Sequence, residues 1–213
     1  MLNTHEHHDP TGGNAAVIAA TGAKLIAHHR VGGRIAGVDR GVQAGDVIKV
    51  GKICELECLD APGHTLSHSC MLSHSEQPAL FSGDTLFNAG AGNVHNGGDV
   101  NALYSTFADQ LARLPDTMQV YPGHDFIENK LRSTLDREPD NAAVRALLPR
   151  VADQDPATSA VNVLAQEKKG QPLHAPEQSL RNRPAAQKLS RPAGRARCQD
   201  ILYKVKGIAE HMV

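Results

Sequence analysis

The sequence predicts an α/β protein, and three observations support this class. Short apolar or alternating runs, typical of strands, occur at residues 46–50, 53–59, 69–73 and 78–82. Apolar residues spaced as on one helix face occur in other segments, most clearly over residues 99–114. Strand patterns are followed by helix patterns along the chain, which is the order expected of a mixed α/β domain.

The first half of the chain predicts one helix and three strands. Residues 15–29 begin as an Ala-rich helix that ends near Gly22, and a short buried strand follows over residues 24–27. Residues 46–50 and 53–59 alternate apolar with polar side chains on either side of a glycine turn. This pattern predicts a β-hairpin with one buried face.

The second half predicts a long amphipathic helix and shorter elements around it. Residues 99–114 have apolar positions on one helix face, with Asp99 placed to cap the helix N-terminus. We expect strands at residues 69–73, 78–82 and 118–121, and helices at residues 126–135 and 141–152.

The composition changes near residue 169 and divides the chain in two. Residues 1–169 contain all the predicted strands and helices and form one domain. In residues 170–213, prolines and arginines interleave and large aliphatic residues become rare. Such a segment buries too little apolar surface to offset its ordering entropy, so we predict a mobile basic tail with a short terminal element.

Charge and hydropathy argue against two kinds of partner. The formal net charge of the 213 residues is −1, so no broad attraction to nucleic acid is expected. No apolar run reaches the length of a membrane-spanning helix, and the first residues are polar with no signal-peptide pattern. We therefore expect a cytoplasmic protein with neither a membrane nor a nucleic acid as its partner.

Polar side chains gather at four places where a predicted strand ends. The four stretches are THEHHD at residues 4–9, PGHT at 62–65, SGDT at 82–85 and YPGHD at 121–125. In an extended segment, His5, His7 and Asp9 would share one face, while Glu6 and His8 would point elsewhere. Imidazoles combined with carboxylates suit zinc, iron or manganese, so the pattern predicts a metal site.

These stretches resemble the motifs of the metallo-β-lactamase superfamily, and within it those of glyoxalase II, the hydroxyacylglutathione hydrolases. The superfamily motif T-H-x-H-x-D-H is similar to THEHHDP, and its P-G-H-T and G-D-T-L-F elements occur unchanged here. The stretches VYPGHDFIENKLR and EPDNAAV resemble the glyoxalase II sequence around its last histidine ligand. The resemblance implies an αββα sandwich for residues 1–169 that lacks its first N-terminal strands.

The resemblance also implies a ligand set and a reaction. It assigns one metal to His5, His7 and His64, and a second metal to Asp9 and His124, with Asp84 bridging the two. Zinc is the implied cofactor, as one or two ions, with iron or manganese as alternatives. In the family, a metal-bound hydroxide attacks a small thioester such as a glutathione conjugate, so Asp9 and Asp84 are the implied catalytic residues.

The chain departs from the family pattern at Pro10. The family has a histidine at this position that completes the second metal site, and proline offers no donor atom. The second site would then keep Asp9, Asp84 and His124 together with solvent, and a single metal in the first site is the alternative. His8 could replace the missing ligand only if its side chain pointed inward.

Two further departures concern the chain start and the substrate. The strand that leads into the first motif is reduced to about residues 1–3, so we expect an open sheet edge that a partner or a second copy could cover. The positions aligned with the family's substrate-binding residues are Asn93, His95, Phe126 and Lys168. Asn93, His95 and Phe126 differ from the family's residues, whereas Lys168 lies in a stretch that resembles the family's E-K-x-x-N-P-F-x-R but lacks its arginine. These departures leave the thiol and acyl groups of the substrate open.

Three functions are therefore compatible with the sequence. The motif GDTLF and the N-x-L-R pattern favour a glyoxalase II-like thioester hydrolase. A mononuclear-iron enzyme resembling the persulfide dioxygenases is the first alternative. A metal-binding remnant that acts as an interaction module is the second, because a fold alone does not guarantee activity.

Overall fold

The computed structural model describes residues 1–152 and 161–170. Its elements are α1 (His8–Thr11), α2 (Asn14–Thr21), β1 (Ile26–His28), η1 (His29–Arg34), β2 (Arg40–Val42), β3 (Val47–Val50), β4 (Cys54–Asp60), β5 (Ser69–Ser73), β6 (Ala79–Gly83), β7 (Leu86–Phe87), β8 (Gly90–Ala91), α3 (Val100–Ser105), η2 (Thr106–Gln110), η3 (Leu111–Arg113), β9 (Gln119–Pro122), α4 (Ile127–Arg137), α5 (Ala142–Val151) and α6 (Leu164–Gly170). The predicted basic tail lies outside the described residues, apart from Gly170 at the end of α6.

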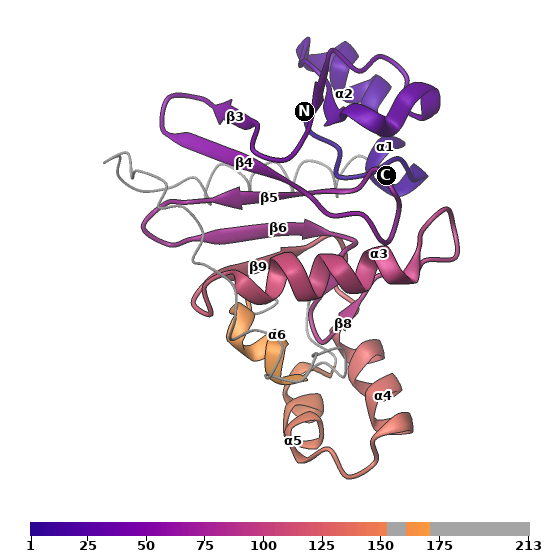
Figure 1. Cartoon of the computed structure of the whole chain (residues 1–213), viewed down its shortest axis with the longest axis vertical. Helices are drawn as coiled ribbons and strands as arrows, with labels where there is room; N and C mark the ends of the chain where they lie inside the picture. Colours follow the sequence, from indigo (N-terminus) through magenta and orange to yellow (C-terminus); the bar gives the residue numbers. More distant parts are fainter. Residues whose placement is uncertain (153–160, 171–213) are drawn as a thin grey trace.

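A five-stranded sheet in the order β3-β4-β5-β6-β9 forms the centre of the fold (Figure 1). Neighbouring strands are antiparallel except β6 and β9, which run parallel with Leu80 opposite Val120. This parallel pair decides where the functional residues lie, because the chain leaves both strands at the same edge of the sheet. The segments that follow β6 and β9 therefore meet.

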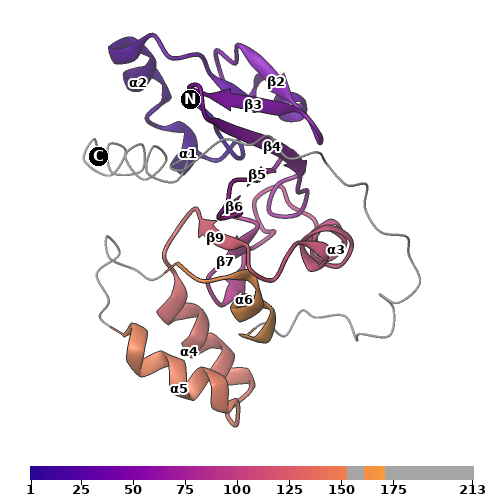
Figure 2. The ribbon, with the colours of Figure 1, turned by 90° about the vertical axis from the view of Figure 1, so that its left-hand side faces the viewer.

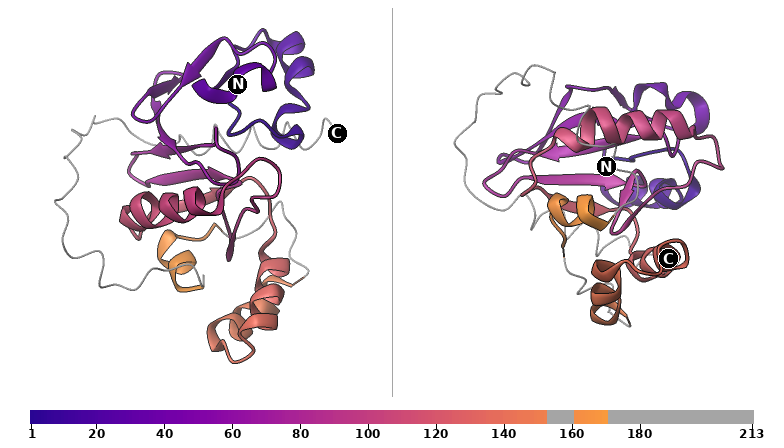
Figure 3. Two further views of the ribbon diagram at one scale, coloured as in Figure 1. Left: turned by 45° about the vertical axis from the view of Figure 1, so that its right-hand side comes forward. Right: turned by 60° about the horizontal axis from the view of Figure 1, so that its bottom comes forward.

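One face of the sheet is covered by the segment formed by α3, η2 and η3, which crosses it in the views of Figures 1 and 3. Leu72, Leu80 and Val120 point to this face and pack with Leu111 in one apolar cluster. Leu164 of α6 extends the same cluster. The strands alternate between two buried faces, as a sheet inside a layered domain requires.

The opposite face packs against a small second sheet formed by β1 and β2. These two strands run parallel, and Leu2 pairs with Ile26 along the outer side of β1. Val42 and Ile26 pack against Leu56 and Met71 of the central sheet. The core thus contains two sheets face to face with helices outside, which is the αββα sandwich that the sequence resemblance implied.

The helices α4 and α5 form a hairpin at the end of the molecule farthest from α2 (Figure 2). Leu131 of α4 and Val144 of α5 are buried in an apolar cluster of their own. Ala89, in the turn between β7 and β8, also belongs to this cluster and connects the hairpin to the domain. Within the described residues, no helix combines the length and apolarity that crossing a bilayer needs.

Most predicted elements are present, and the differences have local causes. Asp99 caps α3 by accepting a 2.7 Å hydrogen bond from the backbone N–H of Ala102. The helix predicted over residues 99–114 is interrupted: α3 passes into a π-helical turn at η2 and a 3-10 turn at η3. The predicted strand at 24–27 lies at Ile26–His28. The short elements α1, β2, β7, β8 and α6 lacked a pattern long enough to predict.

Replacement of Leu80 by alanine tests the core. Leu80 is fully buried on the central strand β6. Its truncation leaves a cavity and should lower the free energy of unfolding by about 2–5 kcal/mol. Val47→Ala on β3 is the control, because Val47 is 44% exposed and its loss should change stability by about 0.5 kcal/mol or less. Urea denaturation of both variants measures the difference, and equal effects would contradict the described core.

Candidate metal centre

The four predicted polar stretches meet at one edge of the central sheet. Asp84 follows β6 and His124 follows β9, so the parallel pair brings these two side chains together. His64 lies in the connection from β4 to β5, which turns at the same edge. The N-terminal segment is held beside them, because the backbone N–H of Ser69 donates to the carbonyl of Thr4.

Three imidazoles surround a common point. One ring nitrogen from each of His5, His7 and His64 lies within 4.8 Å of the nitrogens from the other two. Nε2 of His64 is 3.0 Å from Nδ1 of His7. The ring of His5 stands edge-on to both, with centroid distances of 4.8 Å and 4.9 Å.

The outer nitrogens of these rings are held by neighbouring oxygen atoms. Nδ1–H of His64 donates to the carbonyl of Asn93 at 2.7 Å, and Nε2–H of His7 donates to the carbonyl of Asn96 at 2.9 Å. Nδ1 of His5 lies 3.0 Å from the hydroxyl of Thr4. In their neutral forms, His64 and His7 therefore turn a lone pair toward the cluster, which is the orientation that a metal ligand requires.

The second half of the site contains the carboxylates. His124 Nε2 lies 2.8 Å from Asp9 Oδ2. Asp84 Oδ2 lies 3.6 Å from Nε2 of both His64 and His124, between the two halves. One oxygen of Asp9 and one of Asp84 also lie within 4.8 Å of each other and of a ring nitrogen of His5. All six predicted ligands are thus brought together.

Glycines allow the backbone to approach Asp84 closely. A Cβ atom at Gly92 would lie 1.9 Å from the Asp84 carbonyl oxygen, and one at Gly123 would lie 2.4 Å from Asp84 Oδ1. Gly83 has φ = +48°, and a Cβ there would lie 2.8 Å from Thr4 Oγ1. Only glycine fits such contacts, so these positions keep Asp84 close to the histidine segments.

Burial and neighbouring groups shift the pKa values of three residues in the cluster. Burial, followed by the proximity of His64, lowers the pKa of His5 to about 4. Burial raises the pKa of Asp84. Burial is the largest single influence on Asp9 and disfavours its ionisation, but the hydrogen bond with His124 and the proximity of His5 together lower the Asp9 pKa.

The donor set fits a divalent cation. Nε2 of His5 is buried and has no hydrogen-bond partner, a costly arrangement for a polar atom unless something else satisfies it. Neutral imidazoles and carboxylates around one point are the ligands that zinc, iron and manganese accept in proteins. We conclude that the cluster can hold a metal.

Two further histidines lie near the cluster without pointing into it. His68 is fully buried, and its nitrogens contact the backbone N–H of Asp84 and the hydroxyl of Thr85. The ring of His8 lies against Gly12, where a Cβ would come within 2.9 Å of it. His8 therefore does not replace the ligand that Pro10 lacks.

The prediction that residues 5–9 form an extended segment is wrong from His8 onward. His5, His7 and Asp9 do converge, but the segment is not extended throughout, because α1 begins at His8 and contains Asp9. The convergence results from a turn into a helix rather than from strand alternation. Glu6 points away from the cluster, toward Thr65 and Ser67.

The residues predicted to bind substrate divide into two groups. Phe126 stacks on His124 at a centroid distance of 4.9 Å, and Asn93 contacts His64 through its carbonyl. His95 lies in the same exposed loop as Asn93. Lys168 does not join this group: its ammonium pairs with Asp116 at 2.5 Å, before the start of β9 and so at the opposite end of the strand from His124.

Several neighbours of the site carried no recognisable signal in the sequence. The carbonyl of Asn96 and the carboxylate of Glu6 act through contacts that only folding creates. Lys130 of α4 donates to the carbonyl of Ala91 and lies 5.3 Å from the ring centroid of Phe87. Glu167 of α6 is buried and accepts from the backbone N–H of Ala89. No sequence motif marks these roles.

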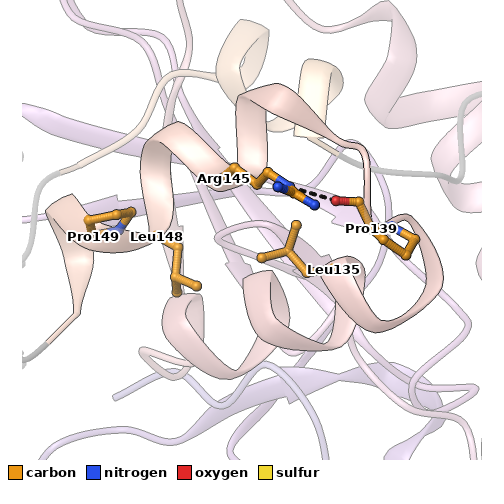
Figure 4. Close-up of a pocket in the computed structure, with 5 residues that line it drawn as sticks. All are labelled: Leu135, Pro139, Arg145, Leu148 and Pro149. Carbon is orange, nitrogen blue, oxygen red and sulfur yellow. Dashed lines mark hydrogen bonds between the residues drawn. The ribbon is translucent and has the colours of Figure 1, made fainter.

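A separate hollow lies on the α4–α5 hairpin, away from the metal cluster (Figure 4). It has a volume of about 380 Å³ and is lined by Leu135, Pro139, Arg145, Leu148 and Pro149. Arg145 donates to the carbonyl of Pro139 across it at 2.6 Å. None of these residues is a predicted site residue, so this hollow is not the candidate site.

Solved structures share this architecture, although no protein-family model matches the chain. The crystal structure of ETHE1 from Myxococcus xanthus aligns with a TM-score of 0.58 and 26% identity, over 80% of this chain and 60% of that one. The structure of the B3 metallo-β-lactamase BLEG-1 aligns with a TM-score of 0.51 and 25% identity, over 58% of this chain and 68% of that one. The fold and the cluster define a protein of the metallo-β-lactamase fold.

A curated relative narrows the class. The chain is 80% identical to the hydroxyacylglutathione hydrolase of Polaromonas sp. strain JS666 over 168 aligned residues. These residues make up 79% of this chain. The chain spans 64% of the length of that relative. The chain is thus a homologue of the hydroxyacylglutathione hydrolases within the metallo-β-lactamase superfamily.

Replacement of Asp84 by alanine tests the centre. Asp84 lies between the two halves of the cluster, so Asp84→Ala should lower the amount of metal bound at both, whereas His124→Ala should weaken only the half that contains Asp9. Metal analysis and melting temperature on the same samples measure the two effects. If Asp84 instead serves only the turn after β6, metal content will stay unchanged and stability will fall by about 1 kcal/mol.

Proposed function

We propose that this chain is a metal-dependent hydrolase of a small thioester, similar to the hydroxyacylglutathione hydrolases. The observation that carries the proposal is the convergence of donor atoms from His5, His7, His64, Asp9 and Asp84 near the orphaned Nε2 of His5, with His124 beside the two carboxylates. The 80% identity to a curated hydroxyacylglutathione hydrolase supports a thioester as the substrate class. A glutathione conjugate is the substrate we propose to test first.

We propose zinc as the metal, with His5, His7 and His64 holding one ion, and Asp9 and His124 holding a second. Asp84 would contact both. When bound, such ions polarise a carbonyl and lower the pKa of a coordinated water. The protein groups do the remaining work: burial lowers the pKa of His5, and backbone carbonyls hold the rings of His7 and His64 in place.

The surroundings suggest how a substrate would lie. The rings of Phe87, Phe126 and His124 contact one another, with centroid distances between 4.9 Å and 6.1 Å. They form an apolar wall beside the cluster that would shield the acyl group from water. We propose that Phe126, Asn93 and His95 contact the substrate, and the position of Lys168 does not support such a role.

Turnover and metal content of the purified chain test the proposal. Zinc together with hydrolysis of a hydroxyacylglutathione thioester would support it. One iron per chain with oxygen consumption on a persulfide would favour the mononuclear-iron alternative. Absence of both metal and turnover would favour the alternative of a remnant that acts as an interaction module. Cytoplasmic location and association across the sheet edge stay predictions.

Pro10→His tests the half of the metal cluster that contains Asp9 and His124 and lacks the family's histidine ligand. We expect the parent to bind between one and two metals, and the variant to gain both metal and rate because histidine restores a donor. Pro10→Ala controls for the loss of proline itself. His8→Ala should leave metal content unchanged, because the His8 ring lies against Gly12. Equal metal binding by Pro10→His and the parent would show that residue 10 is not a ligand position.

A further inference from the structure

Glu6 lies between two of the ligands in the sequence but points away from them. Its side chain is only 10% exposed. A carboxylate in such a place is costly unless hydrogen bonds compensate its lost hydration. Three groups provide this compensation, and all three come from other segments of the chain.

The first two groups come from the segment that carries His64. The hydroxyl of Thr65 donates to Glu6 Oε2 at 2.9 Å, and the hydroxyl of Ser67 donates to Oε1 at 2.9 Å. Thr65 and Ser67 are each about 1% exposed, so their hydroxyls have little access to competing water. Glu6 therefore connects the His5–His7 segment directly to the His64 segment.

The third group is Arg34, at the end of η1. Its Nε lies 3.3 Å from Glu6 Oε1, and one terminal nitrogen donates to the hydroxyl of Ser67 at 2.9 Å. The guanidinium also donates to the carbonyls of Val31 and Arg30. These hydrogen bonds hold the guanidinium against the backbone of residues 30 and 31 while it contacts Glu6.

We propose that Glu6, together with Thr65, Ser67 and Arg34, is a positioning network that holds His5 and His7 against His64 before a metal binds. The inference rests on the metal site named under the proposed function. It goes beyond that site, because these four residues are not ligands and act through the two segments that they join. Replacing these side chains should weaken the affinity for metal more than it lowers the stability of the metal-free protein to urea.

Glu6→Gln is the first test. The amide keeps the size of the side chain but presents one acceptor oxygen and one NH₂ donor, so it cannot accept from both hydroxyls and the guanidinium. We expect the dissociation constant for zinc or cobalt(II), measured by chelator competition, to rise about 10–100-fold. Glu57→Gln is the matched control, since Glu57 accepts a hydrogen bond from His74 on the surface, and it should bind metal as the parent does.

Arg34→Gln distinguishes an effect of charge on metal binding from an effect of positioning. Removal of this cation leaves the charge of Glu6 without a counter-ion and makes the region more negative, so a purely electrostatic effect would tighten binding of a cation. A positioning network predicts the opposite, namely weaker binding. Tighter or unchanged binding by Arg34→Gln would overturn the proposal.

Thr65→Val and Thr65→Ser keep the proposal testable if Glu6 variants fail to fold. Thr65→Val removes one hydroxyl and leaves every charge in place, so we expect weaker binding. Thr65→Ser keeps the donor and should bind within about twofold of the parent. Equal affinities for these two variants would overturn the positioning role.

The readouts separate this inference from the proposed function. Urea denaturation of the metal-free variants measures any change in the fold, and the cobalt(II) absorption spectrum reports the ligand geometry directly. Parent affinity in Glu6→Gln would overturn the positioning role and leave the metal site intact. A parent that binds neither zinc nor cobalt(II) would overturn the metal site itself, and the positioning role with it.

Discussion

The convergence of three imidazole rings is the constraint on which the site depends. A ring nitrogen from each of His5, His7 and His64 faces the other two, and Nε2 of His64 lies 3.0 Å from Nδ1 of His7. Support for this arrangement comes from the far side of each ring, where a carbonyl or hydroxyl holds the outer nitrogen. The loop of residues 92–98 provides two of these contacts through backbone atoms alone.

The carboxylates and the imidazoles of the centre lie on opposite sides of it. Carboxylates lie on one side, where Asp9 pairs with His124 and Asp84 lies between the two halves. Imidazoles lie on the other side, where burial lowers the pKa of His5 to about 4. A cation placed between them would gain from both groups. The same arrangement without a cation leaves a buried nitrogen unsatisfied.

Close backbone contacts make this arrangement possible. The parallel pairing of β6 with β9 places Asp84 and His124 side by side, and glycines at positions 83, 92 and 123 remove the side chains that would separate them. Pro10 is the one departure at the motif itself. Its carbonyl accepts from Asn3 at 2.5 Å, so the residue serves the local fold while offering no donor to the cluster.

The fold class and most strands could be predicted from the amino-acid sequence, because strand alternation is a local property. The six clustered side chains could be named because the motifs that carry them resemble those of a known superfamily. Other features became visible only in the folded chain. It showed that Asp9 reaches the cluster from a helix, that Lys168 lies at the wrong end of β9, and that Glu6 bonds to Thr65 and Ser67. The first fact reflects a single helical turn, too short to leave a periodic pattern. The other two depend on contacts between residues 52 to 61 positions apart, whose geometry is set by sheet pairing and packing. Such long-range contacts leave no periodic trace in the chain, and for that reason the sequence did not reveal them.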